Sequence, residues 1–112
     1  MTESLVELAG PPVHPGQVLQ DELAEIGATA SDAARAIGVP VNRITEILKG
    51  RRSVTADTAL RLGQWLGTGP ELWLSLQQDY DLRTTRRQIS EALKRIPRRR
   101  SSRADRRERA QA

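Results

Sequence analysis

Cysteine is missing from the sequence, and there is a single histidine, His14. Without cysteine the chain can form no disulfide and no thiolate metal site, and it has no thiol nucleophile. A lone histidine leaves no histidine pair for zinc. The sequence also lacks the long apolar run that a transmembrane span or a signal peptide requires. We therefore expect a cytoplasmic protein with no metal, no cofactor and no membrane partner.

The chain has 112 residues, which is enough for one domain and too few for an elaborate two-domain enzyme. Apolar residues make up 38%, which together with eight glycines lies in the ordinary range of globular proteins. The net charge of +4 is unevenly distributed, because residues 94–112 carry nine positive and two negative charges. This end is therefore +7 and residues 1–93 are −3. We interpret the folded part and the basic end separately.

Apolar residues repeat at helical spacing along most of the chain, and glycine or proline separates the repeats. Thr29 and Thr55 stand where helix N-caps are expected. No strand pattern, internal repeat or glycine-rich phosphate loop is present. The sequence therefore predicts an all-α bundle of five to six helices. The expected helices cover residues 15–26, 29–37, 41–49, 55–66, 70–80 and 82–96.

Residues 29–50 carry the most information, because two short predicted helices meet there at a three-residue turn containing glycine. Glycine supplies the left-handed conformation that such a tight turn needs. Alanine at the close approach of the helices, and isoleucine facing inward from the second one, complete the pattern. This spacing is typical of a helix-turn-helix, and we assign its core to Ala34, Gly38, Ile44 and Ile47.

The second helix of this pair then presents polar side chains to solvent, and the opening turn of such a helix enters the major groove of DNA. Arginine can pair bidentately with guanine, and asparagine with adenine. We predict that bases are read by Asn42, Arg43, Thr45 and Glu46. We predict that phosphates are contacted by Thr29, Ser31, Lys49, Arg51 and Arg52. The alternative is that these residues are only the solvated face of a small helical domain.

Aromatic residues at helical spacing indicate a core or a dimer interface more often than a base-stacking platform. The apolar stripe after Asp81 is also hard to bury within one subunit of this size. We therefore assign a homodimer interface to Trp73, Tyr80, Leu82, Ile89 and Leu93. His14 is expected to fix the start of the first helix, and Asp79 and Asp81 are expected to be surface charges.

The chain divides into four expected parts. Residues 1–13 are a flexible leader, 14–81 a helix-turn-helix domain, and 82–97 a C-terminal amphipathic helix for dimerisation. Residues 98–112 are a basic disordered tail, because no apolar residue larger than alanine offsets their ordering entropy. This tail is either a solvated extension or an electrostatic arm that binds nucleic acid through counterion release.

Residues 14–82 resemble HigA-type antitoxins of type II toxin-antitoxin modules, which belong to the Cro/C1-repressor class. The matching stretches begin with His14-Pro15-Gly16 and continue through residues 38–47, 55–62 and 67–82. The resemblance implies a Cro/C1-repressor-like helix-turn-helix and a homodimer that represses its own operon. It also implies neutralisation of a RelE-like toxin, an mRNA interferase, by binding it. It places Asn42 and Arg43 in the base-reading turn, whereas the arginine-rich end has no counterpart.

A dimer that places two recognition helices about 34 Å apart would bind an inverted repeat in double-stranded operator DNA. Two other functions stay open at this point. The first alternative is a stand-alone repressor without a toxin partner, and the second is a toxin-binding module with little DNA binding. No enzyme is expected, because the sequence offers no nucleophile-base pair, metal set or cofactor loop.

Overall fold

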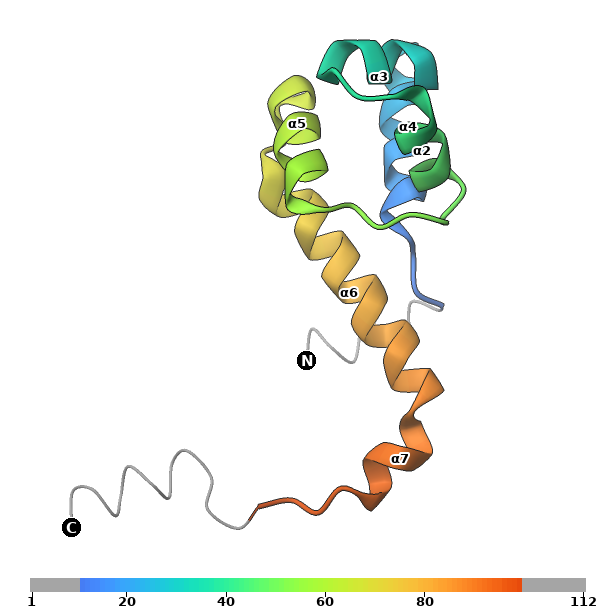
Figure 1. Cartoon of the computed structure of the whole chain (residues 1–112), viewed down its shortest axis with the longest axis vertical. Helices are drawn as coiled ribbons and strands as arrows, with labels where there is room; N and C mark the ends of the chain where they lie inside the picture. Colours follow the sequence, from blue (N-terminus) through green and yellow to red (C-terminus); the bar gives the residue numbers. More distant parts are fainter. Residues whose placement is uncertain (1–10, 100–112) are drawn as a thin grey trace, which may run out of the picture.

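The structure, a computed structural model, describes residues 11–99, and in this range it contains six helices and no strand. Figure 1 shows the helices of the first part of the chain gathered at one end, while the last described segment, up to residue 99, extends away as an arm. The all-α prediction is confirmed. The helices are α2 (Pro15–Ile26), α3 (Ala30–Ile37), α4 (Val41–Leu48), α5 (Ala56–Leu66), α6 (Pro70–Gln88) and α7 (Ser90–Arg95).

Most of the predicted leader and tail, residues 1–10 and 100–112, lies outside the described residues. Within residues 11–99, no helix combines the length and apolar character that a membrane span requires. The same range contains no group of three or more histidine, cysteine, aspartate or glutamate residues placed to hold a metal ion.

Short-range contacts explain why α3 and α5 begin where they do. The Thr29 hydroxyl accepts a hydrogen bond from the Asp32 amide at 3.1 Å, and the Asp32 carboxylate accepts one from the Thr29 amide at 2.9 Å. This reciprocal pair is a capping box, which satisfies two amides that the first helical turn leaves without a partner. The Thr55 hydroxyl caps α5 in a similar way through the Thr58 amide. Both predicted N-caps are confirmed.

The core is built from one apolar face of each helix from α2 to α5 and from the first half of α6. Ala34, Ile44 and Ile47 are all buried, as predicted for the centre of a helix-turn-helix. At Gly16, a Cβ atom would collide with the main-chain carbonyl of Ile47, so α2 and α4 approach each other closely. The buried apolar residues are Leu19, Leu23, Ala33, Ala34, Ile37, Ile44, Ile47, Val54, Ala59, Leu62 and Trp73.

The end of the chain differs from the prediction, because α6 does not end near Asp81 but continues to Gln88. No glycine or proline interrupts this stretch, and Arg86 and Arg87 in its last turn favour the negative end of the helix dipole. The break comes at Ile89, which leaves the helical conformation at φ −111° and ψ 19°. The predicted sixth helix is therefore split between the second half of α6 and the short α7.

The prediction that Trp73 lies in a dimer interface is wrong. Its side chain has no solvent exposure within the single chain. Its indole Nε1 donates a hydrogen bond to the Thr68 hydroxyl at 2.9 Å, so the polar atom is satisfied internally. Trp73 therefore belongs to the core, and it attaches the beginning of α6 to the bundle. A second subunit cannot reach it.

Candidate nucleic-acid interface

The turn between α3 and α4 determines where the outward side chains of α4 point. Gly38 has φ 72° and ψ 42°, the left-handed conformation in which a Cβ would be strained. The Val39 amide donates to the Ala34 carbonyl at 3.0 Å, which closes the last turn of α3. Pro40 then begins α4 at φ −61°, a value that its ring favours. The corner is thus fixed by local backbone geometry.

The predicted base-reading residues lie on the solvent side of α4. Asn42 is exposed, while Arg43, Thr45 and Glu46 are half-buried. The Thr45 hydroxyl donates to the Asn42 carbonyl at 3.3 Å, so it partly serves its own helix. Asn42 and Arg43 both stand in the opening turn, the part of a recognition helix that reaches base edges.

Arg43 has a partner that the sequence did not predict. Its Nη1 donates to Asp57 Oδ1 at 3.0 Å, and Arg61 Nε donates to the same oxygen at 2.8 Å. The spacing of Asp57 and Arg61 on one helix is a recognisable pairing signal. The contact between Arg43 and Asp57 spans fourteen residues and two helices, so only the tertiary structure could reveal it.

The predicted phosphate-contacting residues form two exposed sets. Lys49, Arg51 and Arg52 follow α4 in the segment that leads to α5. Thr29 and Ser31 lie at the N-terminus of α3, where free amides would attract an anion. There, however, the hydrogen bond from the Thr29 amide lowers the pKa of Asp32, so its carboxylate is charged and repels phosphate. The segment after α4, residues 49–55, contains no acidic residue of its own.

His14 fixes the start of α2, as predicted. Its Nδ1 accepts a hydrogen bond from the Gly16 amide at 2.9 Å. The ring packs edge-on against Tyr80, with ring centroids 4.8 Å apart. Burial lowers the pKa of His14 below 6.5, although the charge of Asp81 and a hydrogen bond with the Arg52 backbone act in the opposite direction. The imidazole is thus neutral at pH 7 and touches the segment that carries Arg52.

Acidification is expected to destabilise the protein through His14. Since the pKa is lower in the folded than in the unfolded chain, the unfolded chain binds the proton more readily. Protonation of His14 therefore leaves the free energy of unfolding unchanged at a pH well above 6.5 and lowers it as the pH falls below 6.5. His14→Asn keeps an N-cap side chain but cannot titrate. Urea unfolding at pH 7.5 and 5.5 should show a smaller pH effect in this variant, and equal effects would contradict the assignment.

Gln77 is a buried polar residue that no pattern in the sequence indicated. Its Oε1 accepts a hydrogen bond from the Val54 amide at 2.8 Å, and its Nε2 donates to Asp81 Oδ1 at 2.9 Å. This side chain ties α6 to the segment just before α5, which also carries the exposed arginines. Asp81 and Asp79 are exposed, as expected of surface charges.

No family model matches the chain, whereas individual known proteins do. Virulence-associated protein I of Dichelobacter nodosus is 43% identical over 74 residues, which are 65% of this chain and 68% of the relative. Antitoxin HigA-1 of Vibrio cholerae is 37% identical over 84 residues, which are 74% of this chain and 79% of the relative.

Solved structures with the same fold include proteins described as antitoxins. A HigA-family addiction module antidote protein from Coxiella burnetii is 40% identical, with a TM-score of 0.78, over 80% of this chain and 100% of that one. The Pseudomonas aeruginosa antitoxin HigA, solved with the higBA promoter, is 33% identical, with a TM-score of 0.74, over 77% of this chain and 96% of that one. The likeness therefore extends over almost the whole of these solved chains.

Proposed function

Because the chain belongs to the HigA family of antitoxins, we propose that it binds operator DNA as a homodimer and represses its own toxin-antitoxin operon. We further propose that it neutralises a RelE-like mRNA interferase by binding it. The protein then acts by binding rather than by catalysis. A protein with these partners works in the cytoplasm, at the nucleoid.

The observation that carries the DNA-binding proposal is the position of Asn42 and Arg43. Both lie in the opening turn of α4, on the solvent side of a helix whose inner face is fully buried. The corner at Gly38 and the packed core hold this turn rigidly, as base reading requires. The promoter complex of the Pseudomonas aeruginosa relative supports the same use of the fold.

Within this proposal the exposed side chains have two tasks. Those on α4 read base edges, and those at the start of α3 and after α4 contact phosphates and set the register. Base reading is assigned to Asn42, Arg43, Thr45 and Glu46, where Glu46 would accept a hydrogen bond from a cytosine amino group. Phosphate contacts are assigned to Thr29, Ser31, Lys49, Arg51 and Arg52.

The dimer is assigned to the arm formed by the second half of α6 and by α7. Its apolar side chains are exposed in the single chain, by 53% at Leu82, 41% at Ile89 and 42% at Leu93. An apolar stripe of this kind is the usual feature of a subunit interface. Tyr80 lies at the base of the arm and is half-buried against His14, so only part of its side chain is left for a partner.

Substitution of two arginines tests the DNA-binding proposal. Arg43→Ala is expected to weaken operator binding by about 1–3 kcal/mol and to relax specificity at one base pair. Arg52→Ala is expected to weaken binding to operator and random duplexes alike, because phosphates carry no sequence information. Binding is measured by titrating duplexes from the region upstream of the gene, with single base-pair changes. Equal losses on operator and random DNA for Arg43→Ala would reject its base-reading role.

Toxin binding is tested separately, by co-expression with the neighbouring open reading frame. An antitoxin should co-purify with that product and restore growth. A stand-alone repressor would do neither, and a module that only holds a toxin would restore growth without repressing the promoter.

A further inference from the structure

A single carboxylate oxygen connects Arg43 to the corner of the helix-turn-helix. Asp57 Oδ1 accepts from Arg43 Nη1 at 3.0 Å and from Arg61 Nε at 2.8 Å. Arg61 Nη1 donates in turn to the Ile37 carbonyl at 2.7 Å. Ile37 is the last residue of α3, directly before Gly38. These contacts close a ring that runs through α4, α5 and the turn.

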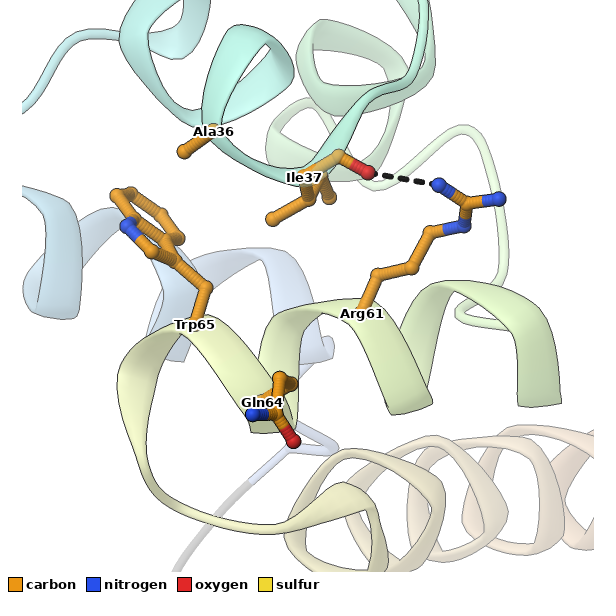
Figure 2. Close-up of a pocket in the computed structure, with 5 residues that line it drawn as sticks. All are labelled: Ala36, Ile37, Arg61, Gln64 and Trp65. Carbon is orange, nitrogen blue, oxygen red and sulfur yellow. Dashed lines mark hydrogen bonds between the residues drawn. The ribbon is translucent and has the colours of Figure 1, made fainter.

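Figure 2 shows the contact between Arg61 and Ile37, which is one part of this ring. The Arg61 side chain leaves α5 and reaches across to the end of α3, where the guanidinium bonds the Ile37 carbonyl. That carbonyl belongs to the same corner that aims α4. Arg61 therefore holds Asp57 in a fixed position relative to the corner. The hydrogen bond from Arg43 to Asp57 in turn restricts where the Arg43 guanidinium lies.

The contact with the charged Asp57 also determines what Arg43 can bind. A guanidinium has five N–H donors, and the contact with Asp57 leaves donors for a bidentate pair with guanine. An unheld arginine would be attracted to any phosphate, which adds affinity without sequence information. Asp57 competes with phosphates for Arg43 and repels them by its own charge. It should therefore lower binding to random DNA more than binding to the operator.

Exposure indicates that this pair matters more in the complex than in the free protein. The side chains of Arg43 and Asp57 are 30% and 58% exposed, and solvated pairs of this kind add little to stability. When DNA covers the surface and excludes water, the same interaction becomes stronger. Loss of the pair should therefore affect DNA discrimination and leave folding almost unchanged.

We propose that Asp57 is a positioning residue for sequence specificity, which holds Arg43 ready for a base edge and keeps it away from phosphates. This inference rests on the proposed function of α4 as a DNA reader. The ligand of this side of α4 is duplex DNA, and Asp57 affects its binding through the contact with Arg43.

The test compares Asp57→Asn, Arg43→Ala and the double variant for binding to operator and random duplexes. Asp57→Asn is expected to bind random DNA more tightly and to lose about tenfold in the ratio of operator to random affinity, the size of one good arginine–guanine contact. In the Arg43→Ala background the same change should leave this ratio unaltered, because the group that it positions is gone. Asp57→Glu, which retains the carboxylate, should recover part of the ratio.

Glu71→Gln is the matched control, since Glu71 and Asp57 each lie in the first turn of a helix and each change removes one negative charge. Like Asp57→Asn, it should leave thermal stability almost unchanged, but it should not alter discrimination between operator and random DNA. If Asp57→Asn changed operator and random binding equally, in both the wild-type and the Arg43→Ala protein, the inference would be overturned. Asp57 would then act on DNA only through its negative charge. A wild-type protein that does not discriminate between the duplexes would instead reject the proposed function itself.

Discussion

Trp73→Ala is expected to lower the free energy of unfolding by about 3–5 kcal/mol, the usual cost of removing a large buried aromatic side chain. The indole is completely buried, and its Nε1 bonds the Thr68 hydroxyl. Truncation would leave a cavity where α6 meets the bundle and would leave that hydroxyl without its donor. Domains of this size are stable by only about 5–15 kcal/mol, so the variant should be close to unfolding.

Trp65→Ala provides the control for this prediction, because it removes the same side chain from a half-buried position. Trp65 lines an open pocket of about 260 Å³ together with Ala36 and Ile37, on the side of α5 shown in Figure 2. Its truncation leaves less enclosed space and should cost less. Urea unfolding followed by far-ultraviolet circular dichroism measures both variants. Equal destabilisation of the two would show that Trp73 is not the main anchor of α6.

Ile89→Asp combined with Leu93→Asp is expected to produce monomers and to abolish tight operator binding. Both side chains are exposed in the single chain, on the arm that we assign to the dimer interface. Burial of two carboxylates against another subunit would cost far more than the interface gains. Without a second subunit, one recognition helix binds alone, and the loss of linked binding should reduce affinity by about 10²–10⁴-fold.

Gln88→Asp combined with Ala92→Asp is the matched control, since it adds two negative charges at the neighbouring exposed positions of the same arm. Ala92 lies about 100° around α7 from Leu93, and Gln88 ends α6 directly before Ile89. This variant should stay dimeric and keep most of its operator affinity. Sedimentation measures the association state, and duplex titration the affinity. An intact dimer of the Ile89→Asp/Leu93→Asp protein would refute the assigned interface.

The family assignment and the two binding proposals depend on different kinds of observation. Similarity over almost the whole length of solved antitoxins establishes the family. Operator reading depends on the exposed opening turn of α4, and dimerisation depends on the uncovered apolar side chains of the arm. The Arg43, Asp57 and interface variants therefore test separate parts of the molecule.

The sequence alone determined the features that short-range interactions control. The caps at Thr29 and Thr55 placed the starts of α3 and α5, because a capping side chain bonds amides only two or three positions away. Pro15, Pro40 and Pro70 marked the starts of α2, α4 and α6, since proline favours the first turn of a helix. Gly38 marked the corner, since the left-handed backbone there excludes most other residues. The outward position of Asn42 followed from the apolar face on the opposite side of α4.

Only the tertiary structure decided the features that depend on which helix faces come together. Trp73 and Leu82 share one helix and similar apolar character, yet the bundle encloses the first and leaves the second in solvent. The pairing of Arg43 with Asp57 needs the beginning of α5 to come within side-chain reach of the beginning of α4, which no local pattern encodes. Helix periodicity shows that a face is apolar. Whether its own chain covers that face depends on contacts between residues far apart in the sequence.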